Sequence, residues 1–333
     1  MMKAIEYTEY GSPEVLHLTE VTKPAQKDNE ILIRVRATSI TVGDLWARNF
    51  KEISPRNFSM PLLLWLPARM FFGISKPRIS ILGSEFAGDV EAVGRDVTRF
   101  KAGDSVFGYR GQSMGANAEY LCMPEDGMVT IKPINMTYEE AATVPYGALT
   151  ALNLLRKVNV QAGQKVLILG ASGGIGSAAV QLAKYFGAEV TGVCSTAGLG
   201  FVRSLGADKV IDYTREDFSK NGETYDLIFD IVRKSSFAQC KDSLKPGGVY
   251  LLASFKMKQL FQMLWTSVRG GMRVVCALSA EKPGDLDFIR ELVKAGKFRS
   301  IIDKCYPLEQ TAEAHRYAEL EGKKGKVAIT LGV

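Results

Sequence analysis

A run of glycines in the middle of the chain places the strongest constraint on its fold. Gly170-Ala171-Ser172-Gly173-Gly174-Ile175-Gly176 follows an apolar strand pattern at residues 165–169 and precedes a helical pattern at 177–186. A second strand pattern follows at 189–194, and the whole unit has the length of about 30 residues expected for a strand–helix–strand motif. Glycines there let the backbone approach a pyrophosphate, which the N–H groups and the dipole of the helix N-terminus then bind. The loop is therefore predicted to bind a dinucleotide rather than to form a purely structural turn.

The same residues fit two fingerprints of dinucleotide-binding dehydrogenases. Gly170-x-x-x-Gly174-x-Gly176 is similar to the short-chain pattern, and Ala171-x-x-Gly173-Gly174-Ile175-Gly176 to the medium-chain pattern. Short-chain enzymes carry the fingerprint near the N-terminus and need Tyr-x-x-x-Lys. Here about half of the chain precedes the fingerprint, and none of the 12 tyrosines has a lysine four residues on. The medium-chain pattern is therefore favoured.

Strand and helix patterns divide the chain into three stretches. Residues 1–140 contain short strand patterns and glycine-rich turns, which predict a barrel-like β domain. Residues 141–277 alternate strands and helices, which predicts an α/β fold with a doubly wound parallel sheet, the Rossmann arrangement. Residues 278–333 are predicted to return to the β domain. The predicted strands are 30–37, 86–94, 105–109, 117–123, 165–169, 189–194, 225–232, 249–253 (after a turn at 246–248) and 327–331, and the predicted helices are 147–157, 177–186, 285–294 and 311–321.

Composition narrows the range of partners. The chain has 333 residues, of which 46% are apolar and 23% charged, as in an ordinary globular protein of two domains. The net charge of +6 is mild, and the basic residues form no dense block, so no nucleic-acid partner is expected.

Cysteine and histidine usage points away from structural metal and disulfide bonds. The five cysteines include no C-x-x-C pair, which excludes a disulfide framework or zinc ribbon and suggests a reducing compartment. The two histidines, His17 and His315, are interpreted as structural or surface residues. The N-terminus lacks the apolar core of a signal peptide, and Met60–Ile74 is interrupted by two prolines and an arginine. We expect a cytoplasmic protein with no membrane span.

The end of the second strand indicates which nucleotide binds. A carboxylate there would hold the 2′-hydroxyl of NAD, but the strand ends Val193-Cys194-Ser195-Thr196. Ser195 and Thr196 are expected to bind a 2′-phosphate, with Arg203 supplying charge, unless the two hydroxyls only cap the next helix. NADP(H) is therefore favoured over NAD(H).

Further motifs spread over nearly the whole length carry a resemblance to a known family. They are Ala37–Asp44, Gly83–Gly88, Gly103–Gly108, Leu149–Ala151, Leu205–Tyr213 and Gly325–Val327. With the glycine loop, they resemble the zinc-lacking branch of the medium-chain dehydrogenase/reductases, the quinone oxidoreductase or zeta-crystallin type. The resemblance implies a GroES-like catalytic domain at 1–140 and 278–333, a Rossmann domain at 141–277, and a homodimer or homotetramer.

Departures from the zinc-dependent relatives bear on the chemistry. Where they have a cysteine and a histidine as zinc ligands, this chain has Thr41 and Ser84. No cysteine lies between 123 and 193 to supply a third ligand, and none lies between 90 and 121 for a structural zinc lobe. A tetrahedral zinc site needs such ligands. We therefore expect metal-free hydride transfer to a small, apolar, electron-poor acceptor, a quinone or an α,β-unsaturated carbonyl compound.

The resemblance also implies individual site residues. Thr41, Trp46 and Tyr146 occupy catalytic positions, with Tyr146 expected as a hydrogen-bond donor to the acceptor and Trp46 as a stacking or merely packing ring. The implied cofactor-binding residues outside the loop and the 2′-phosphate set are Thr150, Tyr213, Ser254, Phe255 and Lys326, of which Lys326 contacts a phosphate or lies in solvent. Relatives often have glycine where Arg233 stands, and this arginine either lines the cleft or points outward.

Two apolar stretches, 58–81 and 255–272, permit two interpretations. Packing in the core or at a subunit interface is favoured, and an apolar lid over a lipophilic acceptor is the alternative. Two other functions also stay open: a nucleotide-binding redox sensor or structural protein with little turnover, and an alcohol dehydrogenase, which the missing zinc ligands disfavour.

Overall fold

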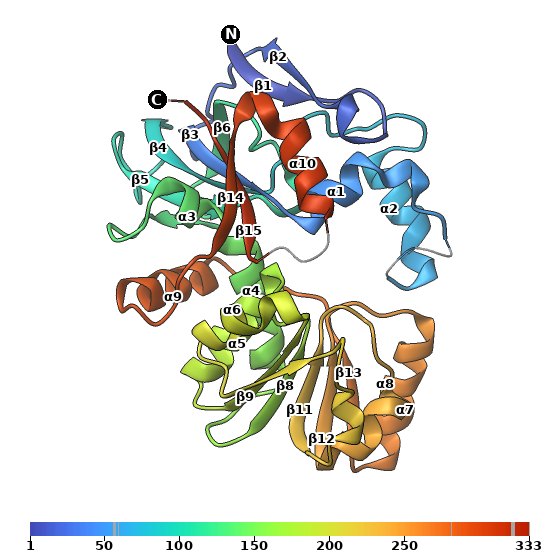
Figure 1. The fold of residues 1–333 in the computed structure, drawn as a ribbon. Helices are drawn as coiled ribbons and strands as arrows, with labels where there is room; N and C mark the ends of the chain where they lie inside the picture. Colours follow the sequence, from blue (N-terminus) through green and yellow to red (C-terminus); the bar gives the residue numbers. More distant parts are fainter. Residues whose placement is uncertain (56–57, 59, 281, 321–323, 333) are drawn as a thin grey trace.

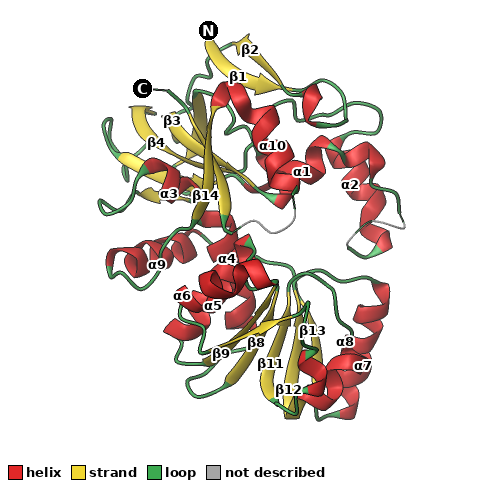
Figure 2. Ribbon diagram, viewed as in Figure 1, coloured by secondary structure: helices red, strands yellow, loops and turns green. Residues whose placement is uncertain are grey.

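The fold consists of two parts, each built on its own large sheet (Figure 1). The structure is a computed structural model that describes residues 1–55, 58, 60–280, 282–320 and 324–332. Figure 2 shows the division by secondary structure: a mostly β part contains both termini, and an α/β part is formed by the middle of the chain. Among the described residues, no helix is both long and apolar enough to cross a bilayer.

The α/β part contains a six-stranded parallel sheet in the order β10-β9-β8-β11-β12-β13. This is the doubly wound order of a Rossmann fold, with its switch point between β8 and β11. The predicted fold class is thus confirmed. The strands are β8 (Lys165–Leu169), β9 (Glu189–Cys194), β10 (Lys209–Asp212), β11 (Tyr225–Asp230), β12 (Leu244–Leu252) and β13 (Arg273–Cys276).

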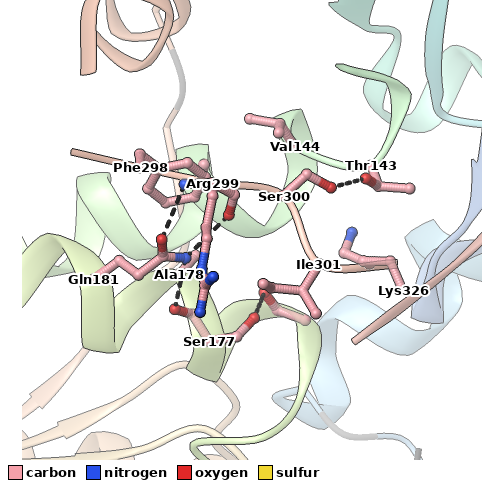
Figure 3. Close-up of a pocket in the computed structure, with 12 residues that line it drawn as sticks. Thr143, Val144, Ser177, Ala178, Gln181, Phe298, Arg299, Ser300, Ile301 and Lys326 are labelled. Carbon is pink, nitrogen blue, oxygen red and sulfur yellow. Dashed lines mark hydrogen bonds between the residues drawn. The ribbon is translucent and has the colours of Figure 1, made fainter. Parts of the chain in front are cut away.

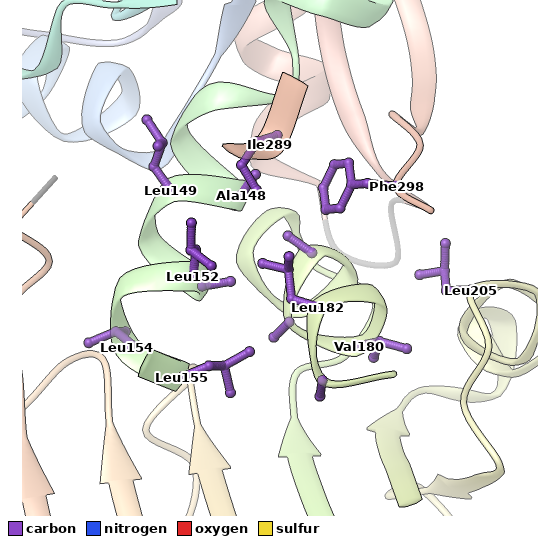
Figure 4. Packing of buried hydrophobic residues seen from close by; sticks show 14 of the residues in the cluster. Ala148, Leu149, Leu152, Leu154, Leu155, Val180, Leu182, Leu205, Ile289 and Phe298 are labelled. Atoms are coloured by element: carbon purple, nitrogen blue, oxygen red, sulfur yellow. The ribbon is translucent and has the colours of Figure 1, made fainter. Parts of the chain in front are cut away.

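Helices cover both faces of this sheet, because successive strand residues point to opposite faces. On β8, Val166 and Ile168 pack into the cluster shared with helices α4 and α5, whereas Leu167 and Leu169 pack into the cluster under α8. Figure 4 shows the first cluster, where leucines of α4 meet Leu182 of α5. The helices are α4 (Pro145–Lys157), α5 (Gly174–Tyr185), α6 (Leu199–Ser204), α7 (Phe237–Cys240) and α8 (Met257–Arg269).

The β part is a seven-stranded sheet in the order β14-β15-β3-β4-β5-β7, with β6 also paired to β3, and a separate β1-β2 ladder. The tail strands β14 and β15 join β3 at one edge, so the chain returns to this sheet after the α/β part. The strands are β1 (Met2–Glu6), β2 (His17–Val21), β3 (Glu30–Ile40), β4 (Glu85–Val93), β5 (Ser105–Tyr109), β6 (Tyr120–Pro124), β7 (Val129–Ile131), β14 (Ile302–Pro307) and β15 (Lys326–Thr330).

Among the described residues, five further α-helices surround the β part and its junction with the α/β part. Helix α9 packs against both β7 and α4, and α10 lies over β14 and β15. These helices are α1 (Val42–Arg48), α2 (Trp65–Phe72), α3 (Tyr138–Ala142), α9 (Pro283–Lys294) and α10 (Thr311–Glu319).

Several predicted boundaries need correction. The strand predicted over 225–232 ends at Asp230, whose carboxylate accepts a hydrogen bond from the Arg233 amide and so turns the chain. The turn predicted at 246–248 lies inside β12, at an irregular register with β11. The helix predicted to Glu321 ends at Glu319 in the structure, and Glu321 lies outside the described residues.

Candidate functional site

The glycine loop lies at the switch point of the parallel sheet. Gly170 directly follows β8 with φ of +86°, and a Cβ there would lie 2.6 Å from Val232 Cγ1 in the loop after β11. A Cβ on Gly176 would lie 2.0 Å from the carbonyl oxygen of Gly170. Both positions therefore need glycine, one for the left-handed backbone and one for close packing of the helix on the loop.

The first turn of α5 is open to an anion. Gly173 is its N-cap residue and forms no side-chain cap, and a Cβ on Gly173 would meet only the Gly170 carbonyl oxygen, at 3.5 Å. The first amides of a helix lack intrahelical acceptors, so they and the helix dipole favour a phosphate here. The loop therefore fits the pyrophosphate of a dinucleotide. Ala171 is fully buried with its amide bound to Val193, so the ligand-facing part of the loop begins at Ser172.

A carboxylate lies beside the predicted 2′-phosphate site. The Thr196 hydroxyl donates to Asp212, the last residue of the neighbouring strand β10. The hydroxyls of Thr196 and Thr214 hold the pKa of Asp212 below its usual value, with Arg215 adding to the effect. The Thr196 hydroxyl thus donates its proton to Asp212 in this structure, and a 2′-phosphate would compete with that carboxylate for it. The predicted contact between Thr196 and a 2′-phosphate stays a prediction. Ser195 is the N-cap residue of a short 3-10 helix and forms no side-chain cap, so its hydroxyl caps nothing.

Two other residues predicted near the adenosine end are exposed. The backbone amide of Tyr213 donates to the carbonyl of Cys194 at the end of β9, while its side chain is 63% exposed. Arg203 is exposed on α6, the helix that follows β9. Both placements leave the side chains accessible to a nucleotide.

On the β side, a buried carboxylate joins three segments that are distant in sequence. Glu85, at the start of β4, is fully buried and accepts from the Ser39 hydroxyl. Its Oε1 accepts from the Tyr146 amide at 2.5 Å, and its Oε2 lies 3.0 Å from Lys326 Nζ. The same ammonium lies 5.2 Å from the centre of the Tyr146 ring. We call Glu85, Tyr146 and Lys326 the Glu85 cluster.

The Glu85 cluster abuts the glycine loop. A Cβ on Gly174 would lie 2.8 Å from Lys326 Cε, so the lysine stem crosses the first residue of α5. Gly147, next to Tyr146, approaches from α4, where a Cβ would lie 2.4 Å from the Gly174 carbonyl oxygen. Thr150 lies one helical turn after Tyr146, on the same face of α4, and is largely buried. Lys326 is therefore not a solvent-exposed lysine. In addition to any contact with a phosphate, its side chain links the two parts of the fold at the glycine loop.

Thr41 already forms hydrogen bonds that serve the structure of the β part. It caps α1, and its hydroxyl donates to Asp44 Oδ2 at 2.6 Å and lies 3.2 Å from Ser84 Oγ. Asp44 also accepts from the amides of Thr41 and Gly83, and burial raises the pKa of this fully enclosed carboxyl. The predicted catalytic role of Thr41 therefore competes with a cap that already engages its hydroxyl.

The same contact tests whether zinc fits. Thr41 and Ser84, at the positions expected for two zinc ligands, are brought together as hydroxyls rather than as a thiolate and an imidazole. Zinc in proteins is held mainly by cysteine, histidine and carboxylate ligands. Within the described part of the chain, no three such side chains come together as a metal site. These residues do not fit a tetrahedral zinc ion.

The remaining predicted residues lie in different environments. Trp46 is half-buried on α1, with its ring centre 6.1 Å from that of Phe58. Ser254 is half-buried beyond β12, but Phe255 is 5% exposed and packs into the core under α8, so its side chain is not presented to a cofactor. Arg233 has φ of +53°, a left-handed conformation that glycine adopts without strain.

A hydrogen-bonded seam holds α5 against the tail of the chain (Figure 3). Gln181 of α5 accepts from the Arg299 amide at 2.9 Å and donates to its carbonyl at 3.2 Å, and Thr143 bonds Ser300. The cavity in this seam has a volume of about 20 Å³, room for one water molecule. This cavity is too small for a nicotinamide or a quinone. The hydrogen bonds of the seam therefore fix the position of α5, and the seam does not bind substrate.

Glu85, Asp44 and Asp212 were missed as site residues by sequence reasoning. Glu85 and Asp44 lie inside the quoted motifs, but their burial and partners depend on residues far away in the chain. A usable signal was the presence of isolated carboxylates within otherwise apolar, glycine-rich segments, since buried charges are kept only with partners.

Comparison with known proteins agrees with this architecture. Residues 27–133 match the family model "Alcohol dehydrogenase GroES-like domain", and residues 205–329 match "Zinc-binding dehydrogenase". The chain is 32% identical to 2-methylene-furan-3-one reductase of Solanum lycopersicum, over 98% of this chain and 79% of that protein. It is 28% identical to the chloroplastic NADPH-dependent alkenal/one oxidoreductase of Arabidopsis thaliana, over 98% and 79%. The structure of a quinone oxidoreductase from Coxiella burnetii superimposes with a TM-score of 0.85 at 29% identity, covering 99% of both chains.

Proposed function

The chain belongs to the medium-chain dehydrogenase/reductase family, and we propose that it is an NADPH-dependent, zinc-independent reductase of quinones or α,β-unsaturated carbonyl compounds. The observation that carries the proposal is the contact between the Glu85 cluster and the glycine loop. It sets a phenol and a buried ion pair beside the first turn of α5, where the nucleotide fits. The similar proteins named above are reductases and a quinone oxidoreductase, which supports this substrate class.

In this proposal the chain orients the reactants and holds the acceptor. The reduction adds one hydride and one proton to the acceptor; a bound NADPH supplies the hydride, and water supplies the proton. The α5 N-terminus binds the pyrophosphate, and Thr150 contacts the cofactor from α4. The Tyr146 hydroxyl donates a hydrogen bond to the acceptor oxygen as negative charge develops there. Glu85 positions Tyr146 through its backbone amide, and Lys326 fixes the ring from the other side.

We propose NADPH over NADH on the residues around the end of β9. Ser195, which directly follows β9, and Arg203, which is exposed on α6, support this assignment. The Asp212 carboxylate accepts hydrogen bonds from the Thr196 and Thr214 hydroxyls. One of the similar proteins is named as NADPH-dependent. Replacing Arg203 with alanine should raise the KM for NADPH several-fold and leave that for NADH unchanged, as steady-state kinetics would show. An equal effect on both cofactors would contradict the assignment of Arg203.

Zinc independence rests on the donor atoms present, Thr41 and Ser84, which do not suit zinc. The domain boundaries at 140/141 and 277/278, the homodimer or homotetramer, and the cytoplasmic location stay predictions.

The test is NADPH oxidation with 1,4-benzoquinone and with a small alkenal, in the presence of a chelator, with NADH run in parallel. We expect turnover with NADPH that the chelator does not reduce. Tight NADPH binding without turnover of either acceptor would overturn the proposal in favour of a nucleotide-binding sensor or structural protein. Alcohol oxidation that appears only after zinc is added would favour an alcohol dehydrogenase.

A further inference from the structure

Helix α8 carries a second apolar face that the fold does not use. Its inner side packs through Leu260 and Met263 into the core of the parallel sheet. Its outer side exposes Phe261 (64%), Leu264 (59%), Trp265 (52%) and Val268 (87%). The spacing of these four residues is that of one continuous stripe along a helix. For residues 255–272 the sequence favoured packing in the core or at a subunit interface. These four side chains lie outside the core, and packing at a subunit interface stays a prediction.

The segment around α2 exposes a matching set of apolar side chains. Leu63 (64%), Leu66 (58%) and Met70 (57%) follow one another at helical spacing along α2 and the turn before it, and Ile74 (65%) is exposed just beyond the end of the helix. The helix is held from behind: Trp65 Nε1 donates to the Ile53 carbonyl at 3.1 Å. These side chains also lie outside the core, and the other half of the prediction for 58–81, packing at a subunit interface, stays a prediction.

Both helices lie on the same side of the molecule. In Figure 1, α2 borders the β part and α8 borders the α/β part, at the same edge of the view. Helix α8 starts shortly after the carboxyl end of β12, the sheet edge that carries the nucleotide loop. The two helices that carry the apolar stripes thus lie on one side of the junction between the parts.

The charged residues within the two segments that carry the stripes have a single sign. Residues 53–84 contain no aspartate or glutamate but include Arg69, Lys76 and Arg78. Residues 243–280 also contain none, while Lys258, Arg269 and Arg273 lie in or next to α8. No ion pair between described residues engages any of these six cations. The Arg269 guanidinium instead lies 4.3 Å from the centre of the Trp265 ring.

We propose that α2 and α8 together dock onto an anionic lipid surface. Large apolar and aromatic side chains on exposed helices, surrounded by lysine and arginine, are the composition that inserts into the headgroup region of an anionic bilayer. The alternative occupant, a second copy of this chain on the same patch, would place the two sets of cations opposite each other across an apolar interface. Charge complementarity therefore selects the lipid. Lipid docking does not depend on which acceptor is reduced.

The test is co-sedimentation of the full-length protein with extruded vesicles. One set contains phosphatidylcholine with about one third phosphatidylglycerol, and the other contains phosphatidylcholine alone. The wild type should bind the anionic vesicles at least about tenfold more tightly, with binding weakened by salt. Equal binding to both sets, or no binding to either, would overturn the proposal.

Two surface variants locate the binding face, and a third is the control. Phe261→Ser with Trp265→Ser removes the centre of the α8 stripe, and Leu66→Ser with Met70→Ser does the same on α2. Each pair should reduce binding to the anionic vesicles at least about tenfold. Ile134→Ser, a change at an equally apolar residue that is 99% exposed far from both helices in sequence, should change nothing. Losses as large with Ile134→Ser would show a nonspecific effect and contradict the proposal.

Two readouts distinguish lipid docking from self-association and from a failure of the catalytic proposal. Light scattering after gel filtration gives the molecular mass: variants that lose mass but keep vesicle binding would assign the stripes to an interface between copies and overturn the lipid proposal. Reduction of soluble 1,4-benzoquinone should be unchanged in the α8 pair. Failure of the catalytic proposal would abolish that activity in the wild type while leaving vesicle binding intact.

Discussion

At the carboxyl edge of the parallel sheet the site is made of backbone: Gly170 and Gly176 let the loop and α5 close on each other, and Gly173 leaves space at the helix N-terminus. On the β side it is made of buried polar side chains, the Glu85 cluster and the Thr41–Asp44 cap. A further buried group lies nearby in the same part, where Arg48 pairs with Glu319 and contacts His315. We therefore expect larger side chains to destabilise the glycine loop and its contact with α5. We expect a changed charge or pH to destabilise the buried polar groups of the β part.

The largest effect is expected at Gly176 of the loop. Gly176→Ala places a Cβ within 2.0 Å of the Gly170 carbonyl, and neither backbone segment can move away without opening the loop. The unfolding free energy should fall by about 3 kcal/mol or more, and NADPH binding should be lost. Urea unfolding and fluorescence titration with NADPH would measure both. Gly200→Ala is the matched control, because nothing lies within 4 Å of that position on α6 and alanine should stabilise the helix by about 1 kcal/mol.

Neutralising the buried carboxylate of the Glu85 cluster should come next. Glu85→Gln leaves the Lys326 ammonium, only 10% exposed, without its counter-charge, which typically costs about 3 kcal/mol of unfolding free energy. Glu91→Gln makes the same change farther along β4, at a half-exposed pair with Lys23, and should cost below about 1 kcal/mol. Urea unfolding of both variants gives the comparison. Equal losses would show that burial does not distinguish the two pairs.

What the sequence predicted follows the same division. The glycine loop was predictable because its residues are contiguous and the strand and helix patterns around it are local. The Glu85 cluster was not, since Glu85, Tyr146 and Lys326 meet only when β4, α4 and β15 are assembled. Asp212 escaped notice for a related reason: it ends β10, whereas the fingerprint expects its carboxylate at the end of β9.

Helix α8 shows another limit of sequence patterns. Its apolar composition marked the segment 255–272 in the sequence but could not distinguish an inner stripe from an outer one, because apolar residues occupy both faces of the helix. A strand ended earlier than predicted where a side chain accepts a hydrogen bond from the backbone that follows, as Asp230 does from the Arg233 amide. Such side-chain contacts depend on tertiary structure and leave no periodic signal.

The β part should also be the more pH-sensitive region, through His315. Burial, with Arg48 beside it, lowers the pKa of His315 to about 3. Arg48 donates to Nδ1, so the ring must stay neutral in the folded state, while the unfolded chain takes up a proton below a pH of about 6.5. The stability from this group is therefore present above that pH and lost as the pH falls.

The wild type should lose about 2 kcal/mol of unfolding free energy from His315 between pH 7.5 and pH 5, where urea unfolding can be measured. His315→Gln should be less stable at pH 7.5 but show a flatter pH dependence over this range. The only other histidine, His17, is exposed on β2, so His17→Gln should retain the wild-type dependence. A His315→Gln curve as steep as that of the wild type would assign the pH effect to other groups and weaken the contrast between the two regions.

The smallest effect is expected at Tyr146, which lies where the two regions meet and is proposed to donate a hydrogen bond to the acceptor. Tyr146→Phe removes only the hydroxyl, so the Glu85 bond to the backbone amide and the ring contact with Lys326 both persist. The Kd for NADPH should stay unchanged, while kcat with 1,4-benzoquinone should fall about tenfold, or about 1.4 kcal/mol in activation free energy. Tyr185→Phe, at the half-exposed end of α5, is the control with the same change. If Tyr146→Phe keeps the full kcat, the β side positions the cofactor only, and the oxygen of the acceptor must be stabilised from the loop side or by water.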